Sequence, residues 1–257
     1  MGDIKLGTGL FILRHEAEKD LFGVLERIAA LGYDGVEFVG FFGKEPEAIK
    51  EKLDALGMKA IGNHVPADKF EENPDKTIAE HKALGCDYIT IAWPGFASIP
   101  PVGAREFPEI LGLVRKLSAE CVRQGITPLY HNHDFEFNGT PSIFALLLDG
   151  CADEGLCAEP DLGWMTFAGA DPAEYLIEYR NRTPVIHLKD VDKDEEGKVL
   201  FRPTGYGVVN TPRLMPLCLA CKPKWLMIDH DDAYDRDAYD DLALSLEYVK
   251  DLMRIVG

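Results

Sequence analysis

Short apolar stretches alternate with longer amphipathic stretches along almost the whole chain. The short stretches are rich in Val, Ile, Leu and Tyr and are bounded by Gly, Pro or Asp, which is typical of buried strands. In the longer stretches apolar residues recur at helical spacing, as Leu21, Leu25 and Ile28 do between residues 18 and 31. Strands are therefore expected at residues 4–8, 36–39, 59–62, 88–91, 127–130, 156–158, 184–188 and 225–228.

Turn and cap residues divide the amphipathic stretches into helices. Glycines end several of them, at Gly32, Gly57, Gly85 and Gly125, and Asp171 followed by proline begins another. Helices are expected at residues 18–31, 46–56, 75–84, 107–124, 141–148 and 171–179, from residue 212 onward, and at 237–253.

Strands and helices thus alternate in eight units, and this order favours a parallel sheet that closes into a barrel. An open doubly wound sheet is the alternative, but no GxGxxG motif follows the first strand. The 257 residues match the ~250 residues typical of a TIM (β/α)8 barrel, and no Pro/Gly/Ser-rich tract divides the chain. We expect one α/β domain, a TIM barrel over residues 1–257.

Several of the expected strands end in residues that can bind metal or transfer protons. The clearest is the strand at 127–130, which runs into His131, His133 and Glu136. In a TIM barrel the carboxyl ends of the strands carry the active site. A lone His or Asp there is more often structural, but strands five to eight each end in His or Asp, and this predicts a divalent metal site. The candidate residues are Glu37, His64, Trp93, His131, His133, Glu136, Asp161, His187, Lys189 and Asp229.

Three of these candidates have a second interpretation. Lys189 could stabilise an enolate oxygen beside a metal, or it could pair with Asp190 or Asp192. Trp93 and Trp164 follow strands four and six, where their rings could stack on a sugar or cover the core.

The composition narrows the choice of partner. The formal net charge of −17 disfavours binding to nucleic acids and anionic membranes, but it is compatible with a divalent cation and a neutral substrate. No apolar run approaches the ~20 residues that span a bilayer. Six cysteines without a signal peptide indicate cytosolic thiols, and Cys218 and Cys221 form a lone CxxC pair with no second pair to complete a zinc site. We expect a cytoplasmic protein.

The order of the motifs resembles the sugar phosphate isomerase/epimerase family of the xylose isomerase-like TIM barrel superfamily. The resemblance extends over nearly the whole chain and is carried by residues 35–38, 130–137, 159–164, 187–190 and 205–209, above all by HNHDFEF and HLKD. It implies one Mn, Mg, Co or Zn ion held by residues from strands five to eight. By position these ligands are His131, where the family usually has Glu, then Asp161 and His187, and finally Asp229, again in place of Glu.

The resemblance also implies an enzyme that acts on a small carbohydrate or cyclitol by abstracting a proton next to a carbonyl, through an enediolate. Isomerisation or epimerisation is the first expectation, with His133 or Glu136 as the base and Lys189 as a further catalytic residue. The absence of the two usual glutamates favours the alternative activity, that of a lyase of the inosose dehydratase type, but isomerisation or epimerisation remains the first expectation. A non-catalytic sugar-binding barrel is the alternative from another class, and a homo-oligomer is left open. The residues assigned to substrate binding are Glu37, His64, Trp93 and Trp164.

Overall fold

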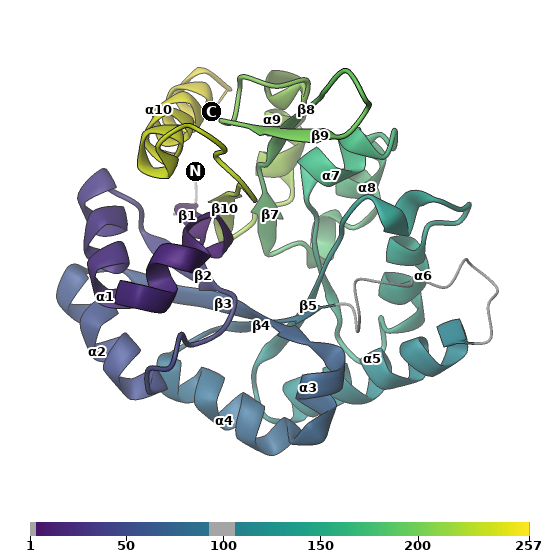
Figure 1. Ribbon diagram of the computed structural model, residues 1–257. Coiled ribbons are helices and arrows are strands. Elements are labelled where there is room, and N and C mark those ends of the chain that lie inside the picture. The colour runs from purple at the N-terminus through teal and green to yellow at the C-terminus, as the bar shows by residue number, and fades with distance from the viewer. Residues whose placement is uncertain (1–3, 93–105, 257) are drawn as a thin grey trace.

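Parallel strands form the centre of the molecule in the computed structural model, which describes residues 4–92 and 106–256 (Figure 1). The 8-stranded sheet has the order β6–β5–β4–β3–β2–β1–β10–β7, and a parallel bridge between Asp161 and His187 links its two ends. The expected TIM barrel is therefore confirmed. Its strands are β1 (Lys5–Gly9), β2 (Gly35–Phe38), β3 (Lys59–Pro66), β4 (Tyr88–Ala92), β5 (Thr127–His131), β6 (Cys157–Glu159), β7 (Val185–His187) and β10 (Trp225–Ile228).

Helices surround the barrel and cover the outer face of its strands (Figure 1). The predicted caps are present: Gly57 and Gly85 have φ angles of 71° and 87°, and their amides donate back to the preceding turn. In α1 the backbone of Asp20 leaves the helical region, at φ −147° and ψ 76°, so the long segment is two helical pieces. The helices are α1 (Arg14–Leu31), α2 (Pro46–Leu56), α3 (Ala67–Glu72), α4 (Pro74–Leu84), α5 (Glu106–Arg123), α6 (Ile143–Gly150), α7 (Leu162–Phe167), α8 (Pro172–Glu178), α9 (Thr211–Ala220) and α10 (Ala238–Val256), with short 3-10 turns η1 (Phe11–Leu13), η2 (Phe135–Phe137) and η3 (Arg180–Arg182).

One segment differs from the sequence prediction. No element is predicted between the strand at 184–188 and the helix from residue 212, but the chain forms an antiparallel hairpin there, of β8 (Asp190–Lys193) and β9 (Val199–Arg202). Val191 and Phe201 face each other across the hairpin and are buried, while the Asp194 carboxylate accepts hydrogen bonds from two amides of the turn. The alternation is short and flanked by charges, which hides it in the sequence.

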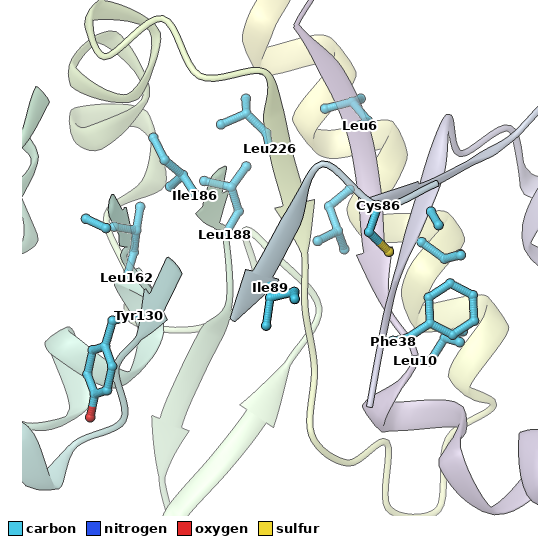
Figure 2. Close-up of a cluster of buried hydrophobic side chains, with 14 of the residues drawn as sticks. Leu6, Leu10, Phe38, Cys86, Ile89, Tyr130, Leu162, Ile186, Leu188 and Leu226 are labelled. Atoms are coloured by element: carbon cyan, nitrogen blue, oxygen red, sulfur yellow. The ribbon is translucent and has the colours of Figure 1, made fainter. Parts of the chain in front are cut away.

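The core has an inner and an outer layer because successive strand residues point to opposite faces of the sheet. Trp225 and Met227 belong to the inner cluster, whereas Leu226 and Ile228 pack between the strands and the helices. Figure 2 shows part of the outer layer, including Ile186 and Leu226. The inner cluster fills the barrel near the amino-terminal ends of its strands, where Tyr88, Val185 and Trp225 begin β4, β7 and β10. The carboxyl ends of the strands remain available for polar site residues. The members of the inner cluster are Ile61, Tyr88, Leu129, Val185, Trp225 and Met227.

A glycine allows this inner packing. A Cβ atom at Gly7 would lie 2.4 Å from Ile61 Cδ1 and 2.6 Å from Met227 Sδ, so a side chain there would displace the inner cluster. All six cysteines carry free thiols. No helix in the described part of the chain is long and apolar enough to cross a membrane.

Candidate metal centre and active site

The strand-end candidates converge on one cavity at the carboxyl rim of the barrel. The cavity has a volume of about 230 Å³, and residues from most of the barrel strands line it. The predicted residues that line it are Glu37, His64, His131, His133, His187, Lys189 and Asp229, and they are joined by Gly9, Phe11, Val39, Pro66, Ala92 and Asp231. The structure therefore brings most of the predicted site together.

His187 stands between two groups of side chains that we name by their chemistry. The carboxylate side consists of Asp161, Asp229, Asp231 and Lys189. The imidazole side consists of Glu37, His64, His131 and Glu159. The Nδ1 atom of His187 lies 3.2 Å from Asp229 Oδ2, and its Nε2 atom lies 3.1 Å from Glu37 Oε2.

The carboxylate side is organised around the Lys189 ammonium. Its Nζ atom lies 3.0 Å from Asp161 Oδ2, 3.0 Å from Asp229 Oδ2 and 2.8 Å from Asp231 Oδ1. An ammonium has three hydrogens, so all its donors can be directed at carboxylates. These contacts differ from the alternative pairing with Asp190, because the Asp190 carboxylate accepts from the amides of 205, 207 and 209 instead.

The imidazole side is a buried network of ring nitrogens and glutamate oxygens. His64 Nε2 lies 3.1 Å from Glu37 Oε2 and 3.4 Å from Glu159 Oε2. Thr90 donates a hydrogen bond of 2.8 Å to Glu159 Oε2 and so fixes that carboxylate from β4. The other oxygen, Glu159 Oε1, is buried without a hydrogen-bond partner among the described residues, although His187 Nε2 is 3.6 Å away. A buried carboxylate oxygen in this state is suited to accept a cation or a proton.

Burial and neighbouring charges set the protonation states on the imidazole side. Burial opposes charge on Glu37 and on His64, but their mutual attraction outweighs it. The pKa of Glu37 therefore lies well below its usual range, and the pKa of His64 is raised to about 10. For His131 and His133 burial dominates: the pKa of His131 falls well below its usual range, and that of His133 falls to about 3. Both rings are neutral near pH 7, the form in which imidazole binds metal or accepts a proton.

The carboxylates around Lys189 titrate differently from one another. Burial raises the pKa of Asp161 to about 6 although Lys189 and His187 oppose this. For Asp229 the same two neighbours outweigh burial and hold the pKa well below its usual range. Burial also opposes charge on Lys189, but the three carboxylates raise its pKa well above the usual value. The ammonium is thus a permanent part of this side.

Two sets of donors in the site could each hold a divalent ion, and the four predicted ligands are divided between them. The predicted ligands approach one another closely, since His131 Nε2 lies 3.9 Å from Asp161 Oδ2 and His187 Nδ1 lies 3.2 Å from Asp229 Oδ2. Two ligands ~2.1 Å from one tetrahedral ion stand roughly 3.4 Å apart, which is comparable. Donor atoms within 4.8 Å of one another form two overlapping groups, one of Asp161, His187 and Asp229, and one of His64, His131, Glu159 and His187. The predicted set draws on both.

Three of the described candidates, Glu136, Trp164 and Asp161, are absent from the cavity lining, and the Asp161 carboxylate contacts Lys189. Glu136 is buried, and its oxygens accept hydrogen bonds of 2.9 Å from the Tyr130 hydroxyl and from the amide of His133. The ring centres of Trp164 and His133 lie 5.9 Å apart, and Lys189 Nζ lies 5.2 Å from the centre of the Trp164 ring. Trp93 lies outside the described residues. The ligand and catalytic roles of the candidate residues stay predictions.

Two site residues are missing from the sequence prediction. Glu159 precedes Asp161 by two residues, so the strand alternation that directs Asp161 inward could have directed attention to it. Asp231 belongs to the acidic run after β10, whose later residues read as a solvated turn. Its contact with Lys189 and its place in the cavity lining distinguish it from its neighbours.

A second cavity, of about 690 Å³, lies at the opposite rim of the barrel. It is larger, but none of the predicted site residues lines it. We therefore place the candidate active site in the smaller cavity, where the proton-transferring and metal-binding side chains meet.

Comparisons with known proteins agree with this architecture. An inosose dehydratase of Geobacillus kaustophilus (strain HTA426) is 24% identical over 191 residues, which is 66% of this chain and 62% of the relative. A sugar phosphate isomerase/epimerase structure from Parabacteroides distasonis ATCC 8503 has the same fold, with a TM-score of 0.78, 20% identity and coverage of 97% of both chains. The structure of IolI protein with a bound zinc atom superposes with a TM-score of 0.75 at 13% identity over 99% of each chain.

The family comparison covers most of the barrel. The sequence model of the family described as xylose isomerase-like TIM barrel matches residues 25–252. That segment contains all the candidate site residues, from β2 to the end of β10. The chain therefore belongs to the xylose isomerase-like TIM barrel family.

Proposed function

We propose that this chain is a divalent-metal-dependent enzyme that removes a proton next to a carbonyl group of a sugar or cyclitol. The observation that carries the proposal is the convergence of imidazole and carboxylate donors in a cavity of about 230 Å³ at the catalytic rim of the barrel. A zinc-holding neighbour and a relative named inosose dehydratase support it. Because the match spans 62% of that relative, the activity rests on the site itself.

One ion is assigned to His131, Asp161, His187 and Asp229. These donors lie at or just after the ends of successive strands around the barrel, β5, β6, β7 and β10, and all four residues are at most 5% exposed. Mixed nitrogen and oxygen donors suit Zn, Co or Mn better than Ca. When bound, the ion would supply positive charge that stabilises an enediolate formed from the carbonyl and its neighbouring hydroxyl.

Two histidines flank the His131 ring and are assigned to proton transfer. The His133 ring centre lies 5.1 Å from that of His131 on one side, and the His64 ring centre lies 4.9 Å away on the other. Both line the cavity. His133 is neutral and accepts the proton from the substrate carbon, whereas His64, charged beside Glu37, returns a proton to an oxygen or carbon.

The remaining residues hold the site in shape or contact substrate. Glu136 accepts from the His133 amide and so positions this base without reaching the cavity. Lys189 keeps three carboxylates in place, which is a positioning role. Glu37 and Phe11 line the cavity and are assigned to substrate contact.

Dehydration is the outcome that we favour. Epimerisation in this family relies on two glutamates at the ends of β5 and β10, and this chain has His131 and Asp229 there. Asp229 is held by both His187 and Lys189, which leaves it unsuited to move a proton. Isomerisation or epimerisation is the second candidate, and the likeness to the Parabacteroides distasonis structure favours it.

Solvent deuterium exchange tests the proposal. The metal-loaded protein is incubated with inososes and with ketoses in deuterated water, and the products are followed by NMR and mass spectrometry. A lyase gives a product lighter by one water, and an isomerase or epimerase gives deuterium at carbon without loss of mass. Neither change with any substrate, together with saturable sugar binding, would support the non-catalytic sugar-binding barrel instead.

A further inference from the structure

The second cavity, at the amino-terminal rim, has a chemistry of its own. It begins where β4, β5 and β6 begin, at Tyr88, Thr127 and Cys157, and it is walled by η3 and by the turn between α9 and β10. Its volume of about 690 Å³ is in the range of small-molecule sites. It lies at the other end of the strands from the candidate active site.

Among the described residues, four cationic side chains and no carboxylate line this cavity. They are Arg180, Arg182, Lys222 and Lys224. Arg182 is engaged, since it donates to the Leu148 carbonyl oxygen and, at 2.8 Å, to the Asp149 carboxylate. The other three have no ion pair with any carboxylate in residues 4–92 and 106–256.

What sets these cations apart is that they line one concavity. The formal net charge is −17, with 44 acidic against 27 basic residues, so most cations could be neutralised locally. Some lysines on the helix surfaces are neutralised in this way, as in the pairs Lys69–Glu72 and Lys116–Glu71, whereas others, such as Lys19 and Lys250, stand singly without an ion pair to a described carboxylate. Cations that converge on one concavity without counter-charges repel one another, and a bound anion would relieve that repulsion.

Helix ends account for only part of the pattern. Arg180 follows the end of α8 and Lys222 follows the end of α9, where a helix dipole favours cations. Lys224 precedes β10 and has no such reason to be there. Lys222 also adopts a φ of 52°, a left-handed conformation in which glycine is usual, so a cationic side chain is kept at a backbone position that disfavours it.

The cavity also offers neutral donors. The Tyr88 hydroxyl makes no hydrogen bond to another described residue, although its residue is 3% exposed and forms the floor. Burial raises the pKa of Tyr88, so the hydroxyl stays protonated and can donate. The amide side chain of Asn181 lines the wall beside the two arginines.

We propose that this cavity binds a small polyanion, a metabolite with several phosphate or carboxylate groups, at the rim opposite the candidate active site. Guanidinium and ammonium groups around a polar floor are the usual recognition elements for such anions. A polymeric anion or a membrane does not fit, because the rest of this acidic surface repels it and the site is a concavity. The proposal is independent of the reaction at the other rim.

The test is a calorimetric titration of the full chain with pyrophosphate and, separately, with citrate. We expect saturable binding with one site per chain, and a stronger signal from pyrophosphate identifies phosphate as the preferred group. In the Lys222→Glu/Lys224→Glu double variant the affinity should fall by about tenfold or more, because two charged contacts are reversed. The matched control is Lys19→Glu/Lys250→Glu, which makes the same change in net charge on helices α1 and α10 and should leave the affinity within about twofold.

Arg180→Ala provides a milder second variant, with circular dichroism confirming that each variant is folded. A loss of affinity in the cavity variants alone supports the proposal. No saturable binding of either anion would overturn it, as would equal losses in the cavity variants and the control. Unchanged affinity in the folded double variant would also overturn it, since the anion would then bind elsewhere.

Discussion

The two sides of the active-site cavity share His187, but their buried carboxylates are neutralised by different groups. On the carboxylate side, three aspartates surround the Lys189 ammonium at 2.8 to 3.0 Å, so a cation built into the chain already neutralises part of the charge. On the imidazole side, Glu37 and Glu159 face histidines, whose charge depends on pH and on bound metal. The first side has a fixed cation, and the second side has groups that can exchange protons.

This difference indicates that the two sides have different roles. A lysine whose pKa is raised well above its usual value cannot give up its proton near pH 7, so it stabilises the aspartates in a defined geometry. The imidazole side instead holds rings in different charge states near pH 7, since His64 is charged and His131 is neutral, so one ring can give a proton and another can accept one. We therefore expect the carboxylate side to govern stability and ion binding, and the imidazole side to govern turnover.

The largest effect is expected from Lys189→Met. The substitution keeps the length of the side chain but leaves Asp161, Asp229 and Asp231 without their cation, and breaking a buried ion pair in this way costs about 3–5 kcal/mol. The free energy of unfolding, measured by urea denaturation of metal-free protein, should fall accordingly. Added Zn or Mn should recover part of it.

Arg213→Met is the matched control for that variant. Arg213 pairs with Asp171 at 2.7 Å on the surface, where solvent screens the pair and its loss should change stability little. A loss for Lys189→Met no larger than for the control would mean that the buried aspartates do not depend on the ammonium.

His187→Ala should have the next largest effect, because His187 contacts both sides. Loss of one of four ligands should weaken ion binding by about 100-fold or more, and turnover should fall with it. Elemental analysis after gel filtration measures the bound metal. Retention of metal at the wild-type occupancy would show that His187 is a structural residue.

A pair of isosteric variants distinguishes the two sides as ion sites. Asp229→Asn removes a charge from the carboxylate side, and Glu159→Gln removes one from the imidazole side. If the ion has the ligands that we propose, Asp229→Asn should lower its affinity by ~10–100-fold, and Glu159→Gln should change it less. The opposite order would move the ion to the group of His64, His131, Glu159 and His187.

The sequence predicted the barrel well because its signals are local and repeated. Each strand is a short apolar run, and caps such as Gly57 and Gly85 mark the helix ends by their left-handed φ angles. The hairpin of β8 and β9 was missed because its pairing depends on contacts between Val191 and Phe201 that charged neighbours obscure. Trp93 lies outside the described residues, so its predicted role is not addressed.

The rim residues were predictable, but their partners were not. Position at a strand end identified His131, His187 and Asp229 without any knowledge of the structure. The contacts of Lys189 with three aspartates could not be predicted from spacing, because they join a residue that follows β7 to residues 161, 229 and 231. Glu136 shows the same limit: it lies in a prominent motif, yet its carboxyl faces Tyr130 and the His133 amide instead of the cavity.

Glu136 belongs to neither side, and its titration should affect the pH dependence of stability instead of ion binding. Burial raises its pKa to about 8, although hydrogen bonds from His133 and Tyr130 oppose the shift. The folded protein therefore holds this proton more tightly than the unfolded chain, in which the pKa is near 4.3. The stabilisation is complete below about pH 4.3 and is lost as the pH rises towards about 8, at up to ~1.4 kcal/mol per pH unit.

Glu136→Gln removes that proton equilibrium while its carbonyl oxygen can still accept a hydrogen bond. The free energy of unfolding of the wild type should fall relative to that of the variant between about pH 5 and pH 8, because only the wild type must ionise a buried carboxyl. Urea denaturation of both proteins across this range measures the difference, in which the titration of Asp161 and the other shared groups cancels. Parallel curves would mean that Glu136 ionises at its ordinary pKa, and that its carboxylate is charged beside His133 at neutral pH. It would then regain its place, beside His133, among the candidates for the catalytic base.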